Sequence, residues 1–345
     1  MKAVVYYRSK GLVVEDVPMP GLEAGEVLVK VIKVGFCGSD HSLIESGSLK
    51  DGTILGHEVS GIVMENNKQA TGLKPGSRVI IRPTFCGRCK DCRAGRPYLC
   101  QINRRSIGIG DMQGGFAEYV KVYPQMLIPI PEGVDLENAA LAEPFAAALH
   151  GIRCSDRKAG SALIIGGGAI GLALAMLLKI LGSGPIAVSE PVKEKRDLAK
   201  NLGADIVIDP SKEDIVGRVL DETKGLGFDV VFECSGSQRS IQTGIDTAAR
   251  GGTVCVVSII MTETSIIPLT LNFKEIWLTG SYSNTHEENI KCLDWMAKGK
   301  LDARPLITDR IELEELSFVY EKRVKAGKTI KVMADVGKDY GTVQG

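Results

Sequence analysis

The chain has 345 residues, which suggests two domains, each large enough for its own hydrophobic core. Lys and Arg together number 42, as do Asp and Glu, so the formal net charge of zero gives no basic excess for binding nucleic acid. With 44% hydrophobic and 24% charged residues, the composition excludes an intrinsically disordered chain.

The N-terminal segment contains Lys2 and Arg8 but no apolar run, so it does not look like a secretory signal and we expect a cytoplasmic protein. Residues 159–178 are uncharged and long enough for a membrane helix, but four glycines interrupt them. A buried strand, a turn and a helix explain this segment better, and we expect no membrane contact. The nine cysteines are odd in number and unevenly spaced, which favours metal binding over disulfides in a cytosolic chain.

The first 150 residues or so are predicted to be rich in strands, because apolar and polar residues alternate between turn residues. The candidate strands are Met1–Arg8, Leu12–Val17, Glu26–Val34, Gly76–Ile81 and Gly115–Val120. Short strands of this kind are typical of a β-barrel or β-sandwich.

From about residue 160, strands and helices are predicted to alternate. The expected strands are Ala162–Ile165, Ile186–Ser189, Asp205–Ile208, Asp229–Phe232, Thr253–Val257 and Ile276–Gly280. The expected helices are Ile170–Leu181, Val192–Leu202, Ile241–Ala249 and, in the tail, Asn289–Lys298. The first strand is wholly apolar, as in a parallel sheet buried on both faces, and the alternation predicts a doubly wound α/β fold.

Gly166 to Gly171 match G-x-G-x-x-G between a predicted strand and a predicted helix, which indicates a dinucleotide site. We expect Gly166 to allow the turn, Gly168 to admit a pyrophosphate, and Gly171 to let the helix pack closely on the sheet. Glu190 follows 19 residues after Gly171 and could accept hydrogen bonds from a ribose. A carboxylate there favours NAD over NADP, although nearby basic residues keep NADP open. An adenosylmethionine or flavin site, or an unliganded turn, would also use such glycines.

A second motif, C-x2-C-x2-C-x7-C, is formed by Cys86, Cys89, Cys92 and Cys100. Four thiolates within 15 residues can close a tetrahedral zinc site and leave no ligand position for water, so we expect a structural zinc. An iron–sulfur cluster, a zinc ribbon for nucleic acid and unliganded thiols remain the alternatives at this point.

Three further segments are ambiguous singly: Gly35–Asp40 with Cys37, Gly56–Gly61 with His57, and Ala142–Pro144 with Glu143. A lone cysteine or histidine is more often structural than a ligand. Together with the cysteine motif and the dinucleotide motif, in this order, they resemble the zinc-dependent medium-chain alcohol dehydrogenase family. The resemblance covers essentially the whole chain. It is closest to the sorbitol, butanediol and threonine dehydrogenase branch, in which a glutamate precedes the proline at 144.

The resemblance implies a β-rich, GroES-like catalytic domain of residues 1–147 and 284–345, and a Rossmann NAD-binding domain of residues 148–283. It implies an active site in the cleft between them and a dimer or tetramer formed through the Rossmann domains. Besides the glycines and Glu190, the residues expected to line the cofactor site are Ile170, Lys195, Val257, Ser258, Ile259, Ser281, Tyr282 and Ser283.

The same resemblance implies a catalytic zinc near Cys37, His57 and Glu143, with Glu58 as a ligand or close neighbour. A thiolate and two carboxylates carry more negative charge than the zinc ion has positive charge. We therefore expect that Glu58 and Glu143 do not both bind the ion tightly throughout turnover. Asp40 would hold the far nitrogen of His57. Ser39 would accept the substrate proton before hydride passes to the nicotinamide.

Two features depart from the family pattern. The outer histidine of the proton relay would stand at Ser42, whereas this chain has His41 one residue earlier. The Arg–aromatic pair typical of polyol dehydrogenases is absent from Gly280–Asn284. We therefore expect NAD-dependent oxidation of a secondary alcohol such as a polyol, vicinal diol or sugar derivative. The alternatives are threonine 3-dehydrogenase-like oxidation and a catalytically silent regulator that binds zinc and NAD.

Overall fold

The computed structural model describes residues 1–66, 73–155 and 160–337. The chain divides into two compact units, residues 1–143 with 289–345 (unit 1) and residues 144–288 (unit 2). The boundaries expected from the sequence lie after residues 147 and 283. Within the described ranges no helix has the length and apolarity needed to cross a bilayer.

Unit 1 is built on a seven-stranded sheet and a smaller three-stranded sheet. The large sheet has the order β15 (Ile307–Glu312), β16 (Lys331–Asp335), β3 (Val27–Phe36), β5 (Glu58–Asn66), β6 (Arg78–Ile81) and β8 (Leu127–Pro129), with β7 (Tyr119–Val122) also paired to β3. The small sheet consists of β2 (Gly11–Asp16), β1 (Lys2–Tyr7) and β4 (Thr53–Ile54). Alternate residues of β3 are fully buried, so one continuous core lies against these sheets.

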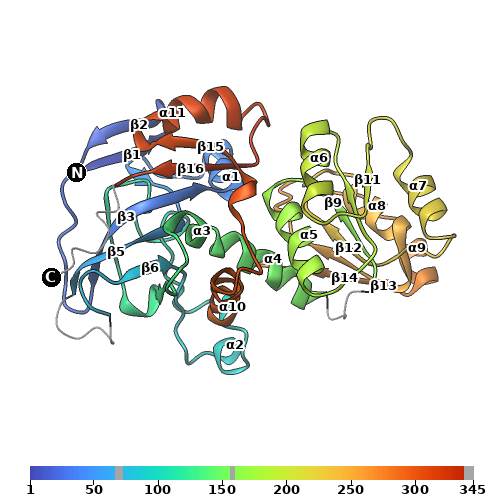
Figure 1. Ribbon diagram of the computed structural model, residues 1–345, viewed down its shortest axis with the longest axis horizontal. Helices are drawn as coiled ribbons and strands as arrows, with labels where there is room; N and C mark the ends of the chain where they lie inside the picture. The colour runs from blue at the N-terminus through green and yellow to red at the C-terminus, as the bar shows by residue number, and fades with distance from the viewer. Residues whose placement is uncertain (67–72, 156–159, 338–345) are drawn as a thin grey trace. The chain divides into compact units, whose positions relative to one another are not determined.

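The helices of unit 1 are short and connect the strands (Figure 1). They are α1 (Gly38–Ser46), α2 (Lys90–Arg93), α3 (Leu136–Ala140), α11 (Leu316–Val319) and a following π-helical turn (Tyr320–Val324). Helix α1 begins directly after β3, with Cys37 at its N-cap and Asp40 accepting the Cys37 N–H. Two helices cross the unit boundaries, α4 (Ala142–Cys154) and α10 (His286–Ala297).

Unit 2 contains a six-stranded, wholly parallel sheet. Its order is β11 (Ile206–Ile208), β10 (Ile186–Ser189), β9 (Ala162–Ile165), β12 (Phe228–Glu233), β13 (Ala248–Val256) and β14 (Trp277–Gly280). Helices α5 (Ala169–Ile180) and α6 (Lys193–Asn201) cover one face, and α7 (Ile215–Glu222), α8 (Ser240–Thr247) and α9 (Pro268–Lys274) cover the other (Figure 1). Successive strands are added outward from β9 to β11, and the chain then crosses back so that β12 to β14 are added on the other side of β9. This is the doubly wound arrangement, in which ligands bind at the carboxyl ends of the strands.

Candidate functional site

A cluster of three candidate metal donors forms where two neighbouring strands of unit 1 meet. Cys37 follows the end of β3, while His57 and Glu58 stand at the start of β5. These strands are antiparallel, with Gly35 paired to Glu58, so the end of one lies beside the start of the other. One donor atom from each of the three side chains lies within 4.8 Å of the other two.

Two polar side chains flank the ring of His57. Asp40 is fully buried, and its Oδ1 lies 3.3 Å from Nδ1 of His57, the position expected for it. The Ser39 Oγ lies 3.4 Å from Nε2 of the same ring. A carboxylate behind a histidine fixes the orientation of the ring and leaves the other nitrogen to face a ligand.

Glu58 has a partner that the sequence did not reveal. The Nζ of Lys331, from β16, donates to both carboxylate oxygens at 2.6 and 2.7 Å and to the Phe36 carbonyl at 3.2 Å. Both side chains are almost fully buried. A Cβ on Gly35 would lie 2.1 Å from Glu58 Oε2, so the glycine makes the room in which the pair meets.

The charges around this cluster are concentrated and mostly negative. Burial alone would lower the pKa of His57, but the charges of Asp40 and Cys37 raise it well above its usual value. Burial also opposes the charge on Lys331, yet Glu58 raises the pKa of this lysine. A thiol, an imidazole and carboxylates in a buried, negatively charged setting suit a zinc ion.

Glu143 and His41 occupy positions next to this cluster. Glu143 lies in the first turn of α4, and among the described residues its carboxylate is outside the group of donors that gather within 4.8 Å. Its charge nevertheless adds to that of Glu58 in raising the pKa of Lys331. The His41 Nδ1 lies 3.2 Å from the Tyr320 hydroxyl, which donates to Glu45 at 2.9 Å.

The cysteine motif forms a second group of donors in unit 1. The sulfur atoms of Cys86, Cys89, Cys92 and Cys100 all lie within 4.8 Å of one another. The Cys89 N–H points at the Cys86 sulfur and the Cys92 N–H at the Cys89 sulfur, at 3.3 and 3.5 Å. Only Cys100 is buried in this segment, so the lobe lacks a hydrophobic core of its own and suits a tetrahedral metal.

The glycine-rich turn in unit 2 has the geometry expected of a phosphate cradle. Gly166 has a φ of +105°, and a Cβ there would lie 2.8 Å from the Ser235 nitrogen. A Cβ on Gly171 would lie 1.9 Å from the Gly166 oxygen, whereas one on Gly168 would meet no atom within 4 Å. The two outer glycines are therefore needed by the fold, and the middle one leaves open space at the N-terminus of α5.

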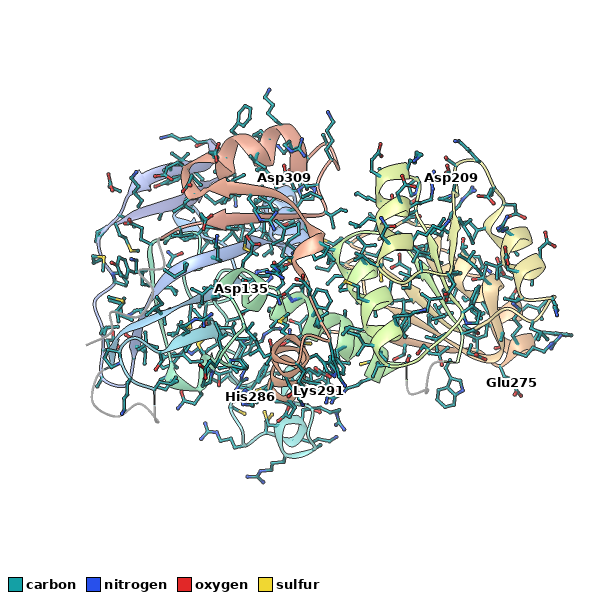
Figure 2. All side chains as sticks on the ribbon, in the orientation of Figure 1. Asp135, Asp209, Glu275, His286, Lys291 and Asp309 are labelled. Carbon is teal, nitrogen blue, oxygen red and sulfur yellow. The ribbon has the colours of Figure 1, made fainter. Side chains whose placement is uncertain are left out.

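Glu190 braces this turn. Its Oε2 accepts the Gly167 N–H at 2.8 Å and its Oε1 accepts the Val192 N–H at 2.9 Å. Each oxygen keeps a second lone pair, so the carboxylate can still accept a ribose hydroxyl. Arg196 donates to the Glu190 carbonyl and forms a 2.7 Å ion pair with Asp209, which Figure 2 labels.

The remaining residues predicted for the cofactor lie on two helices and two loops of unit 2. Ile170 and Lys195 are half-buried in the first turns of α5 and α6. The others follow the carboxyl ends of β13 and β14, the edge at which doubly wound folds bind ligands. They are Val257, Ser258, Ile259, Ser281, Tyr282 and Ser283, of which Ile259 and Tyr282 are each 57% exposed.

Apart from Asp40, the sequence interpretation missed the residues that act through another side chain. Lys331 and the Arg196–Asp209 pair belong to no motif, and Gly35 was noted only as the first residue of the Cys37 segment. A glycine one position before Phe36-Cys37 was visible in the sequence, but only the pairing of β3 with β5 and β16 shows what it makes room for.

The chain is similar to known dehydrogenases in both sequence and fold. Residues 23–132 match the family model of the alcohol dehydrogenase GroES-like domain, and residues 169–298 match that of the zinc-binding dehydrogenases. The chain is 34% identical to the L-threonine 3-dehydrogenase of Pyrococcus abyssi (93% of this chain, 94% of the other). It is 30% identical to the sorbitol dehydrogenase of Bacillus subtilis (96% of each). A solved structure from Sinorhizobium meliloti 1021, described as a zinc-binding dehydrogenase bound to NADP, aligns with a TM-score of 0.89 and 34% identity over 97% of this chain and 99% of the other.

Proposed function

Because the chain belongs to the zinc-dependent medium-chain alcohol dehydrogenase family and is an oxidoreductase acting on alcohols, we propose that it oxidises a secondary alcohol reversibly with NAD. The substrate is a polyol, a vicinal diol or a hydroxylated sugar derivative. The observation that carries this proposal is the gathering of Cys37, His57 and Glu58 within 4.8 Å. The same chain also holds a dinucleotide turn with open space at Gly168.

The proposal includes two zinc ions in each chain. Cys86, Cys89, Cys92 and Cys100 would hold the structural ion, and Cys37 and His57 would hold the catalytic one with Glu58 or Glu143. When bound, the catalytic zinc would lower the pKa of a substrate hydroxyl. Lys331 already neutralises Glu58, which supports the expectation that the two glutamates do not bind the ion tightly at the same time.

The residues around the ion divide the remaining work. Asp40 orients the His57 ring through Nδ1, and Ser39 stands beside Nε2, where its hydroxyl can receive the proton of a bound alcohol. From Ser39 the proton passes to water or to His41. The contact of His41 with Tyr320 leads onward to Glu45 and supports the second route without deciding it.

NAD is the proposed cofactor. The buried Glu190 carboxylate would repel a 2′-phosphate, and the neighbouring cation Arg196 is occupied by Asp209 and by the Glu190 carbonyl. Because the relative from Sinorhizobium meliloti binds NADP, the two cofactors need a direct comparison. We expect kcat/KM to be higher with NAD than with NADP.

The experiment that tests the function is an assay of purified protein with NAD and a panel of polyols, vicinal diols, sugar acids and threonine. Nicotinamide reduction is followed with and without a zinc chelator. Reduction that needs zinc and favours one hydroxylated class supports the proposal. Reduction with threonine alone would favour the second candidate function, which the Pyrococcus relative supports. No reduction by protein that holds two zinc ions and binds NAD would mean a substrate narrower than the panel. No reduction together with only one zinc per chain would favour the silent regulator.

We also propose that the protein forms a dimer or tetramer through unit 2. Strand β14 is an edge strand, and several apolar side chains on and beside it are exposed. Trp277, Phe273 and Leu269 are 71%, 70% and 68% exposed, and Glu275, labelled in Figure 2, turns the chain between α9 and β14. An open edge with apolar neighbours favours pairing with a second copy. None of the nine cysteines, all of which the structure describes, forms a disulfide, and this fits the cytoplasmic location that we propose.

A further inference from the structure

A buried histidine in unit 2 links a cysteine to a glutamate, and none of the three belongs to either metal cluster. His150 and Cys154 lie four residues apart on α4, so they share one face of the helix. The His150 Nε2 lies 3.4 Å from the Cys154 sulfur, and its Nδ1 lies 3.0 Å from Glu288 Oε1. The thiol and the carboxylate contact opposite nitrogens of the ring and do not converge on one point, as ligands of a metal ion would.

Glu288 is fixed in place by the start of α10. Its Oε2 accepts the Thr285 N–H at 2.7 Å, while its own N–H donates to Thr285 Oγ1 at 3.2 Å, which is a capping box. Its Oε1 is left for His150 and for Arg153, which donates to it at 3.1 Å. Although burial opposes ionisation, these contacts hold the pKa of Glu288 below its usual value.

The ionised carboxylate sets the chemistry of the ring. It accepts the Nδ1 proton of His150, so Nε2 of the neutral ring is an acceptor that faces the thiol. A nucleophile, a base and a carboxylate that orients the base form the arrangement that activates a thiol. Against burial, contacts with Cys154 and Glu288 raise the pKa of His150 to about 9, which agrees with an imidazolium beside the sulfur.

We propose that Cys154 is an activated thiol that reacts with hydroperoxides. Its proton passes to His150 Nε2, and the sulfur attacks the outer peroxide oxygen, forming an S–O bond as the O–O bond breaks. The sulfur is oxidised to a sulfenic acid and the peroxide is reduced. The imidazolium proton goes to the departing oxygen, which leaves as water or an alcohol. Cys154 is partly exposed and therefore accessible to a small reagent.

Two probes test this proposal on the zinc-loaded, full-length protein. Iodoacetamide at pH 6.5 measures the reactivity of each thiol by peptide mapping, and hydrogen peroxide followed by a sulfenic-acid trap identifies the oxidised residue. An ordinary thiol is only about 1% ionised at this pH. Because His150 would take the proton from the Cys154 sulfur, we expect Cys154 to be alkylated about fivefold faster than glutathione at this pH. The trap should label Cys154, and Cys154→Ala should remove that label.

The variant His150→Gln separates an activating role from a structural one. Activation predicts slower alkylation of Cys154 at pH 6.5 and little change at pH 9, and Glu288→Gln should give an intermediate rate. The Cys154 sulfur faces His150 and Cys255, and the His150 ring faces Glu288, which Arg153 also contacts. The pH profile of alkylation therefore reports on these groups. If His150 had only a structural role, its loss would loosen the packing. Iodoacetamide would then label both Cys154 and the buried Cys255 faster in His150→Gln than in the wild type. Any one of three results would overturn the proposal. They are this joint labelling of Cys154 and Cys255, alkylation of Cys154 no faster than that of glutathione, and a trap that leaves Cys154 unlabelled.

Discussion

Glu58 and Lys331 form an ion pair in the space left by Gly35. The pair depends on three strands that lie side by side in the sheet. Strand β3 lies between β5 and β16, so Glu58 and Lys331 approach from opposite sides and meet above Gly35. Charges buried in this way are costly unless paired, and removing one partner leaves the other without compensation. The metal cluster and the stability of unit 1 are therefore coupled through Glu58.

Replacing Lys331 with methionine should destabilise the protein by about 3 kcal/mol or more, because Glu58 would then be a buried, unpaired carboxylate. The measurement is urea unfolding of chelator-treated protein, so that metal binding does not contribute. Lys331→Met/Glu58→Gln should lose less than the sum of the single variants. Lys193→Met, at an exposed ion pair with Asp197, is the control and should change little. Additive losses would contradict the coupling.

The His150 site should make stability depend on pH. The pKa of His150 is about 9 in the folded protein and near 6.5 when unfolded, so the folded state binds more protons between these values. Its contribution, about 3 kcal/mol at most, is fully present below pH 6.5 and is lost as pH rises through 9. Unfolding free energies measured from pH 6 to 10 should show this fall in the wild type and a flatter curve in His150→Gln. Parallel curves would assign the fall to other groups.

At the residue scale, motifs predicted the donors and Asp40, but not the lysine that pairs with Glu58. Cys37, His57 and Glu58 could be proposed because two short segments carry them. Lys331 could not, because it is 273 residues from Glu58 and lysines are rarely buried. Only strand pairing, which sequence patterns do not specify, brings it to the site.

At the scale of elements, the glycine-rich turn separates folding from binding. Gly168→Ala should leave the unfolding free energy within about 1 kcal/mol, because the backbone φ of −75° suits alanine and no atom lies near the added Cβ. It should weaken NAD binding, because the methyl group would occupy the space open to the phosphates. Gly171→Ala is the matched variant and should destabilise the protein, since its Cβ would overlap the Gly166 oxygen. Titration calorimetry and thermal unfolding measure the two effects, and unchanged NAD affinity in Gly168→Ala would contradict the placement of the phosphates.

The cysteine lobe should depend on metal for its order. Between Cys86 and Cys100 the only regular elements are α2 and a 3-10 turn at Pro97–Leu99, and little side-chain area is buried. Cys92→Ser should reduce the zinc content by one ion per chain and make this segment the first site of limited proteolysis. Cys154→Ser, outside both clusters, serves as the control. A lobe equally resistant in Cys92→Ser would show that it holds itself together without metal.

Elements with a clear pattern were predicted well, and those without one were not. The wholly apolar run Ala162–Ile165 is β9 to the residue, and helix α5 differs from its prediction by one residue at each end. Strand β5 was not predicted, because Glu58, Ser60 and Gly61 interrupt its apolar pattern although all three are buried. The predicted strand Gly115–Val120 begins later, at Tyr119. At the start of the predicted strand, Gly115 packs against Val59, which leaves no room for a side chain at position 115.

At the scale of the molecule, the exposed apolar side chains of unit 2 predict self-association. Trp277→Lys should lower the mass measured by sedimentation, because a charge at the start of the edge strand β14 opposes pairing with a second copy. Leu226→Lys is the control: it is 74% exposed but lies between α7 and β12, away from that edge. Equal masses for the wild type and Trp277→Lys would place the interface elsewhere.

The discontinuity of unit 1 also has a consequence for synthesis on the ribosome. A chain emerges from its N-terminus, so unit 2 is complete before β15 and β16 have been made. Until then the large sheet ends at β3, and Glu58 has no lysine opposite it. A nascent chain in which Glu58 is still unpaired can bring its carboxylate to a metal without competition, whereas the finished protein cannot. Strand β16, which is translated after unit 2, thus determines when the donor cluster reaches its final charge.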